Sequence, residues 1–374
     1  MDQKIIFIAG GGTGGHIYPG IAIARALQKK ASEQDGISIF GEKANLQIRF
    51  VGTKTGMETK IIPREGFSLD LIQGGKLNFS GGIFEKIRTW VKMPIGFLQA
   101  ISLIWKYKPH FVLGVGGYAS GPFVLAAAAL GIPTAIWEPN AHPGMANRWL
   151  SRFVDRCYVV FSQSKAGLKN RKIFQFGMPV RREIEEAIKV PRKDDQFHLL
   201  SFGGSQGSRA ISTALSDALI KGGEWTHQLQ VVHQIGSLDF DKLKAKYRGY
   251  EDLVTPFEFI YDMHNYYAWA DIVVARGGAS TITELAAFGV VPIIIPLPAA
   301  DNHQQKNAES LVAAQAGKML LQSDLTPSRL IEEIQSLRKN PELMKAMSKN
   351  ISKFFQSQAA EKIAKDIFEQ VGWL

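Results

Sequence analysis

The stretch Lys4–His16, KIIFIAGGGTGGH, joins a continuous apolar run to a turn built almost entirely of glycine. Such a run is typical of a buried parallel strand, and a glycine-rich turn after it commonly opens a helix. The stretch His198–Ser208, HLLSFGGSQGS, repeats this pattern in the second half of the chain. Turns of this kind direct backbone N–H groups and the positive end of a helix toward an anion. We therefore expect two similar domains that hold a phosphorylated ligand.

Apolar runs of strand length alternate with helical patterns along the chain, an order that favours an α/β fold with parallel sheets. At 374 residues the chain is longer than one ordinary hydrophobic core requires, so two domains are expected. Because strand, glycine-rich turn and helix recur in both halves, we predict two doubly wound, Rossmann-like domains facing across a cleft. The strand candidates are Ile5–Ala9, Ile48–Gly52, Leu69–Gln73, Phe111–Val115, Thr134–Trp137, Cys157–Val160, Ile173–Phe176, Leu199–Phe202, Leu229–Val232, Thr255–Ile260, Ile272–Ala275, Ile293–Ile295 and Met319–Leu321. Helical patterns run over about 19–30, 84–107, 120–130 and from Leu330 onward.

Composition narrows the classes of protein. The single cysteine, Cys157, excludes an internal disulfide framework and fits a reducing compartment. No signal-peptide pattern precedes the first strand, and no apolar run reaches the roughly 20 residues that span a bilayer. A net charge of +10 predicts an anionic partner. We expect no nucleic-acid partner, because no helix-turn-helix, zinc-finger or RNA-binding motif accompanies the charge.

The positive charge is concentrated between Gln73 and His110, where the only acid is Glu85. Aromatic and aliphatic residues are interleaved with the basic ones, a composition typical of a surface that enters anionic lipid headgroups. An ordinary core helix with a solvated cationic face is the alternative interpretation. The membrane-docking candidates are Ile83, Phe84, Lys86, Ile87, Arg88 and Trp90.

The first glycine-rich turn does not complete a dinucleotide-binding fingerprint. Gly10, Gly12 and Gly15 match its glycine spacing, but the second strand ends without the acidic residue that would bind a ribose. The alternative is that the glycines only allow the backbone to make a sharp turn and bind no ligand. His16 stands at the expected start of a helix, which favours a neutral imidazole able to accept a proton. A structural or phosphate-binding histidine is the competing interpretation.

Further turns follow other strands of the first half. Residues 114–122, GVGGYASGP, form a third glycine-rich turn, expected at the same sheet edge as the first. Glu138 and Asn140 follow a strand and offer a carboxylate and an amide, although a loop acid is normally just solvated. Arg181 follows the last predicted strand of the first half of the chain, and its guanidinium could bind a diphosphate through two hydrogen bonds. A surface arginine is the ordinary interpretation.

In the second half, residues 275–284, ARGGASTITE, join a strand to a helix. Small residues there let a ligand approach the backbone, and Glu284 can accept hydrogen bonds from a ribose diol; stabilisation of a helix start is the alternative. Gln304 and Gln305 open the next helix and suit sugar hydroxyls, or are merely solvated. Asp239 and Asp241 have a spacing used for metal–nucleotide binding, but helix capping explains it, so we expect no metal and no cofactor.

Together these motifs resemble one family. The run Gly-Gly-Thr-Gly-Gly-His at 11–16, Gly-Gly-Tyr-x-Ser-Gly-Pro at 116–122, Gly-Gly-Ser-Gln-Gly at 203–207, Gly-Ala-Ser-Thr-Ile-Thr-Glu at 278–284 and Asp-x-x-Gln-Gln at 301–305 occur in the family's order. The chain is similar, over nearly its whole length, to the MurG-type glycosyltransferases of bacterial peptidoglycan synthesis. The resemblance implies a GT-B architecture, with an acceptor domain at 1–181 and a donor domain at 182–354, and a last helix at about 355–374 packing back on the first domain.

The same resemblance implies an activity. The family transfers N-acetylglucosamine, with inversion, from UDP-N-acetylglucosamine to the muramyl 4-hydroxyl of the undecaprenyl-diphosphate-linked muramyl pentapeptide, lipid I, which gives lipid II. It implies a peripheral enzyme on the cytoplasmic face of the inner membrane, an anionic membrane surface as partner, and contacts with other cell-wall synthesis proteins. With a lipid substrate, the basic and aromatic segment becomes a docking surface, and His16 is the candidate base. The donor-binding positions it implies are Thr13, Gly14, Gly15, Asn140, Arg181, Ser205, Ile260, Ala279, Ser280, Thr281, Ile282, Thr283, Glu284, Gln304 and Gln305.

Two departures from the family pattern stand out. Pro139 replaces the glutamine of a Glu-Gln-Asn motif, and the Ala31–Leu46 connection is longer than usual. Two other functions remain open from the sequence. One is a UDP-sugar epimerase of the same architecture, and the other is a non-catalytic module that binds nucleotide sugar or lipid.

Overall fold

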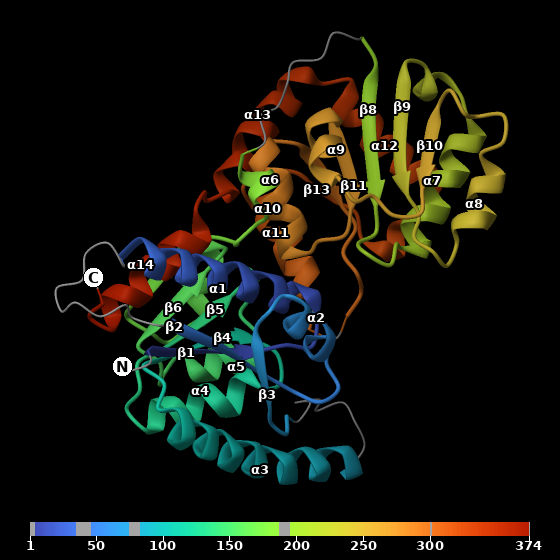
Figure 1. Ribbon diagram of the computed structural model, residues 1–374. Helices are drawn as coiled ribbons and strands as arrows, with labels where there is room; N and C mark the ends of the chain where they lie inside the picture. Colours follow the sequence, from blue (N-terminus) through green and yellow to red (C-terminus); the bar gives the residue numbers. More distant parts are fainter. Residues whose placement is uncertain (1–3, 35–45, 75–82, 187–194, 300, 374) are drawn as a thin grey trace. The chain divides into compact units, whose positions relative to one another are not determined.

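The computed structural model describes residues 4–34, 46–74, 83–186, 195–299 and 301–373, with the side chains of 34 and 83–93 excluded. The chain forms two compact units (Figure 1). Unit 1 comprises Met1–Val180 and Gln356–Leu374, and unit 2 comprises Arg181–Phe355. The chain therefore passes from one unit to the other twice.

Unit 1 is built on a seven-stranded parallel sheet with the order β3-β2-β1-β4-β5-β6-β7. Its strands are β1 (Lys4–Gly10), β2 (Leu46–Gly52), β3 (Ser68–Leu71), β4 (Phe111–Gly116), β5 (Thr134–Glu138), β6 (Arg156–Val159) and β7 (Ile173–Gln175). The apolar runs of the sequence become these strands because both faces of a parallel sheet are covered by helices.

Helices cover both faces of this sheet (Figure 1). On one face lie α1 (Gly14–Gln34), α2 (Glu58–Arg64) and α14 (Ala359–Gln370), and on the other lie α3 (Ile83–Tyr107), α4 (Ser120–Ala129) and α5 (Met145–Leu150). The helices change face where the chain returns from β3 to β4, as right-handed crossovers require.

Unit 2 repeats this architecture with a six-stranded parallel sheet of order β10-β9-β8-β11-β12-β13. Its strands are β8 (Phe197–Phe202), β9 (Leu229–Gln234), β10 (Val254–Phe257), β11 (Ile272–Ala275), β12 (Val291–Ile294) and β13 (Lys318–Met319). Its helices are α6 (Arg182–Glu185), α7 (Arg209–Lys221), α8 (Phe240–Lys246), α9 (Met263–Trp269), α10 (Ala279–Phe288), α11 (His303–Ala313), α12 (Pro327–Arg338) and α13 (Pro341–Ile351). The two doubly wound units and every predicted strand are confirmed, with boundaries that differ by a few residues.

Helix α1 begins earlier than the sequence pattern indicates. The Thr13 carbonyl accepts hydrogen bonds from the N–H groups of His16 and Ile17, at 3.1 and 3.2 Å, so the helix is under way before Pro19. Pro19, the first residue of the predicted 19–30 pattern, therefore lies inside the helix and not at its beginning. Residues Ala31–Gln34 continue α1 rather than opening a surface connection, and 35–45 lie outside the described residues.

The C-terminal helix α14 belongs to unit 1, where it packs on α1. An ion pair between Asp366 of α14 and Arg156 of β6 fixes it, and the hydroxyl of the fully buried Tyr158 donates to the same carboxylate at 2.7 Å. The Asp366 carboxylate thus has both a cation and a hydroxyl donor, which is what burial of its charge demands. Within the described part of the chain, no helix is both long and apolar enough to cross a membrane.

Candidate functional site

In each unit a glycine-rich turn lies where the strand order reverses. The turn after β1 lies beside the turn after β4 in unit 1, and the turn after β8 lies beside the turn after β11 in unit 2. Open α/β sheets bind their ligands at the carboxyl ends of strands at such a reversal. The predicted neighbourhood of the first and third glycine-rich turns is confirmed by this order and by a hydrogen bond of 3.2 Å from Gly11 N–H to Gly116 C=O.

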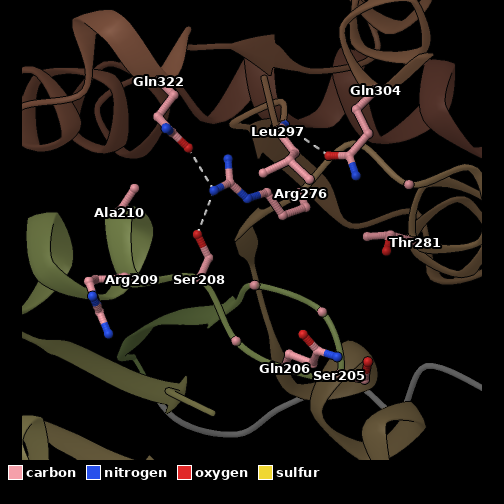
Figure 2. Close-up of a pocket in the computed structure, with 14 residues that line it drawn as sticks. Ser205, Gln206, Ser208, Arg209, Ala210, Arg276, Thr281, Leu297, Gln304 and Gln322 are labelled. Atoms are coloured by element: carbon pink, nitrogen blue, oxygen red, sulfur yellow. Dashed lines mark hydrogen bonds between the residues drawn. The ribbon is translucent and has the colours of Figure 1, made fainter. Parts of the chain in front are cut away.

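A cavity of about 810 Å³ lies at the reversal point of unit 2 (Figure 2). The turn after β8 and the segment after β11 provide most of its wall, with contributions from later loops. The lining residues are Gly203, Gly204, Ser205, Gln206, Gly207, Ser208, Arg209, Ala210, Arg276, Gly278, Thr281, Leu297, Gln304 and Gln322. The volume is in the range of small-molecule binding sites.

The Arg276 side chain is fixed in the wall of this cavity. One terminal nitrogen, Nη2, donates to Ser208 Oγ and Gln322 Oε1, each at 2.7 Å (Figure 2). The other, Nη1, donates to the carbonyls of Ile295 and Pro296, each at 3.1 Å. Burial lowers the pKa of the guanidinium, but arginine keeps its charge in proteins. The Arg276 guanidinium therefore gives the cavity wall a permanent positive charge, and its four hydrogen bonds hold it in place.

Gln234, at the end of β9, connects the second glycine-rich turn to the next strand. Its Nε2 donates to Gly204 C=O at 2.9 Å, and its Oε1 accepts from Ile260 N–H at 3.1 Å. Gln234 is buried, as is the Ile260 side chain. The Ile260 N–H is thus engaged within the protein, and a uracil ring could bind it only by displacing the Gln234 amide.

Helix α10 begins beside the cavity, with Gly278 at its N-cap. The first backbone N–H groups of a helix have no partner within it, so those of Ala279, Ser280 and Thr281 face the helix start. Ser280 is exposed and Thr281 half-buried, whereas Ile282 and Thr283 are buried. The candidate positions Ile282 and Thr283 therefore direct their side chains into the protein interior.

Glu284, in the second turn of α10, accepts a hydrogen bond from the Tyr267 hydroxyl at 2.8 Å. Burial raises the pKa of the Glu284 carboxyl, an effect opposed by the Tyr267 hydrogen bond and by the positive charge of Arg181. The exposed Arg181 precedes α6, a helix in contact with α10. The structure thus brings Arg181 and Glu284 into electrostatic contact within unit 2.

The two glutamines of α11 have different environments. Gln304 Oε1 accepts from Gly277 N–H at 3.1 Å and from Leu297 N–H at 3.0 Å, which fixes two cavity loops (Figure 2). Gln305 donates to Glu309 on the next turn of the helix at 3.0 Å. Only Gln304 lines the cavity.

In unit 1, two N–H groups of the first turn are already engaged. Gly11 N–H is bonded to Gly116, and Gly12 N–H donates to Glu58 Oε2 at 2.8 Å. The His16 ring packs against Gly116, where a Cβ atom would lie 2.7 Å from two ring atoms. Since Gly116 also has a φ of +98°, only glycine suits this position. The anion-binding potential of the turn is therefore concentrated at Thr13, Gly14 and Gly15.

Glu138 is buried and organises the loop that follows β5. Its carboxylate accepts from Asn140 N–H at 2.9 Å, Gly144 N–H at 3.0 Å and Asn147 Nδ2 at 2.9 Å. The interpretation of Glu138 as a solvated loop acid is therefore wrong, because each carboxylate oxygen has buried donors. Asn140 Nδ2 also points to Glu138, at 3.3 Å.

Two other sets of candidate residues have separate outcomes. The docking candidates lie in the first turns of α3, and their side chains are outside the described part of the structure: Ile83, Phe84, Lys86, Ile87, Arg88 and Trp90. Asp239 occupies the N-cap position of α8, but its carboxylate accepts from Arg209 Nε at 3.0 and 3.2 Å instead of capping the helix.

Sequence reasoning missed the residues that hold the turns, namely Glu58, Gln234, Arg276 and Gln322. Arg276 had one available signal, because a charged residue directly after the apolar run of β11 has to find buried partners. Glu58 had none, since Gly12 is 46 positions away and the surroundings of Glu58 resemble an ordinary helix start.

Two doubly wound units, one with a cavity at the reversal point of its sheet, define the class of fold that glycosyltransferases of two Rossmann-like domains share. The model of the glycosyltransferase family 28 N-terminal domain matches residues 6–159, and that of the glycosyltransferase family 28 C-terminal domain matches residues 198–367. The chain belongs to glycosyltransferase family 28.

Relatives with assigned names extend over the whole chain. A protein of Bdellovibrio bacteriovorus named UDP-N-acetylglucosamine–N-acetylmuramyl-(pentapeptide) pyrophosphoryl-undecaprenol N-acetylglucosamine transferase is 58% identical over 98% of this chain and 99% of its own length. A protein of the same name from Myxococcus xanthus is 36% identical, over 96% and 91%. The crystal structure of Acinetobacter baumannii MurG superposes with a TM-score of 0.78 at 28% identity, over 98% of this chain and 99% of that one.

Proposed function

We propose that this protein transfers N-acetylglucosamine from UDP-N-acetylglucosamine to the muramyl 4-hydroxyl of lipid I and so forms lipid II. The 58% identity, over nearly the full length of both chains, to a transferase named for this reaction carries the proposal. The fixed positive charge and the helix start at the cavity of unit 2 support it, because the donor is a diphosphate.

The proposed reaction is a single displacement. The muramyl 4-hydroxyl oxygen forms a bond to the anomeric carbon, and the bond from that carbon to the diphosphate oxygen breaks. UDP leaves with the electron pair, and the hydroxyl proton passes to His16. Because the hydroxyl attacks the face opposite the leaving group, the anomeric configuration is inverted.

Each unit has a distinct part in this proposal. In unit 2 the α10 N-terminus, Arg181 and Arg276 stabilise the negative charge that develops on UDP, and Glu284 receives the ribose hydroxyls. In unit 1, His16 is the general base, at the start of α1. A base placed in this way contributes about 10²- to 10⁴-fold to a rate.

The decisive experiment measures UDP release from UDP-N-acetylglucosamine with and without a short-chain lipid I analogue. We expect release only with the analogue, together with a disaccharide product, and a His16→Ala variant that binds the donor normally but turns over about 10²-fold more slowly or worse. Release without acceptor would favour an epimerase. Donor binding with no release in either case would favour a binding module.

We also propose that unit 1 docks on an anionic membrane, at the cytoplasmic face of the inner membrane, through α3. Support comes from the described part of that helix, where Leu98 and Trp105 are 65% and 67% exposed. Elsewhere in unit 1, the exposed Trp149 and Phe153 rings lie 5.1 Å apart, next in sequence to the exposed Arg152. Large apolar side chains among basic ones suit a lipid–water interface.

A vesicle-binding assay tests the docking surface. Replacement of Ile83, Phe84 and Trp90 with serine is expected to weaken binding to vesicles that contain anionic lipid and to leave donor affinity unchanged. A Val312→Ser variant, which removes an exposed apolar residue from α11 in unit 2, serves as the control. Equal vesicle binding by the triple variant and the unaltered protein would refute the proposal.

A further inference from the structure

A buried carboxylate lies beneath the first glycine-rich turn. Glu58 is the first residue of α2 and is 1% exposed. Its Oε1 accepts from Thr53 N–H at 2.8 Å and from Thr53 Oγ1 at 3.0 Å, and its Oε2 accepts from Gly12 N–H at 2.8 Å. A charge removed from water needs such donors. Glu58 therefore connects the end of β2 to the turn that precedes α1.

Glycine residues on several sides make room for this carboxylate. A Cβ atom on Gly11, Gly52 or Gly56 would overlap the Glu58 side chain. These glycines come from the first turn, from the end of β2 and from the segment before α2. These three glycines therefore make room for the buried Glu58 carboxylate of the protein itself, not for a bound anionic ligand.

We propose that Glu58 is a positioning residue for the acceptor half of the reaction, a role that rests on the proposed transferase function. Gly12 immediately precedes Thr13, whose carbonyl begins α1 and accepts from His16 N–H. The Gly12–Glu58 hydrogen bond therefore sets where Thr13 and His16 stand relative to the sheet. Glu58 itself is too deeply buried to touch a substrate.

The Glu58→Gln variant separates this role from simple packing. The amide keeps the size of the side chain, and its oxygen can still accept from Thr53, but its NH₂ group meets the Gly12 N–H donor and cannot accept from it. We expect kcat/KM for the acceptor to fall by about tenfold to a hundredfold, because small displacements of a reacting group have effects of that size. The donor dissociation constant should change less than the acceptor kcat/KM, since the cavity and most of the implied donor-binding positions lie in unit 2.

Thr53→Val is the matched control. It removes one hydrogen bond from the same carboxylate and keeps the shape of a buried side chain, but it leaves the Gly12 bond intact. We expect a lower urea midpoint and unchanged kcat and acceptor KM. If Thr53→Val loses as much acceptor kcat/KM as Glu58→Gln, the role of Glu58 is general stability and the inference is wrong.

Gly56→Ala provides a second displacement of the carboxylate without a change in charge, and it covers the case in which Glu58→Gln does not fold. A folded variant of either kind with unaltered acceptor kinetics would overturn the inference. Absence of transfer by the unaltered protein would instead refute the proposed function, so the two failures are distinguishable.

Discussion

The two glycine-rich turns have similar sequences but are fixed by groups of opposite charge. The first is held by the Glu58 carboxylate, which accepts from the backbone N–H of Gly12. The second is held by donors, because Arg276 bonds to Ser208 Oγ and Gln234 bonds to Gly204 C=O. A carboxylate occupies backbone donors and adds negative charge, whereas a guanidinium occupies oxygen acceptors and adds positive charge.

This difference separates two turns that look alike as motifs. The second turn lines a cavity with a fixed cation, an environment suited to a departing diphosphate. The first turn has an anion beneath it, which suits an uncharged hydroxyl whose proton passes to a base. A glycine-rich turn therefore acquires its chemical preference from the buried residue that holds it.

The largest expected effect comes from removal of the cation. In Arg276→Ala, four oxygen acceptors lose their buried donor, so we expect unit 2 to lose about 3 kcal/mol or more of unfolding free energy. Affinity for UDP should fall about a hundredfold or more, measured by calorimetry under conditions where the variant is folded. Arg329→Ala, on the exposed surface of α12, is the control for stability. If Arg276→Ala keeps its affinity for UDP, the opposite charges of Glu58 and Arg276 do not explain the different preferences of the two glycine-rich turns.

A smaller effect is expected from Gln234→Leu, which leaves Gly204 C=O and Ile260 N–H without their shared partner. We predict that unit 2 loses about 1–3 kcal/mol of unfolding free energy, measured by urea denaturation, because buried polar groups left without a partner destabilise the folded state. Gln230→Leu, on the same strand, is the control. A urea midpoint equal to that of Gln230→Leu would mean that Gln234 does not hold the second glycine-rich turn.

The smallest expected effect is a pH dependence of the affinity for UDP-N-acetylglucosamine, caused by Glu284 in unit 2. The pKa of Glu284 is raised above its ordinary value of 4.5, so as pH falls the carboxylate is protonated earlier than a solvated glutamate and loses acceptor capacity for ribose hydroxyls. Affinity for UDP-N-acetylglucosamine should be constant above this pKa and fall about fivefold below it, the equivalent of about 1 kcal/mol. Glu284→Gln should bind more weakly at neutral pH without this dependence. The same pH dependence in Glu284→Gln would assign it to another group.

The sequence was sufficient for the sheets but not for the groups that hold the turns. The central strands β1, β4, β8 and β11 could be predicted because a parallel strand buried on both faces is a continuous apolar run, and a glycine-rich turn follows each such run directly. Glu58 and Gly12 are 46 positions apart, and Arg276 and Ser208 are 68 apart. The local pattern of apolar and polar residues cannot predict hydrogen bonds between residues so far apart in sequence. The helical pattern at about 19–30 likewise misses the glycine-rich first turn of α1, which begins at Gly14, although His16 was expected near the start of a helix.

The return of helix α14 to unit 1 has a consequence for synthesis of the chain. Domains usually fold from the N-terminus while the ribosome is still adding residues, and unit 2 is contiguous, so it can close as soon as Phe355 has emerged. Synthesis of unit 1 begins first. However, Arg156 and the Tyr158 hydroxyl lack their hydrogen-bond partner until Asp366 is synthesised, some 200 residues later. Unit 1, which starts the chain, is therefore the last to be completed, and a nascent chain without α14 carries a finished unit 2 and an unfinished unit 1.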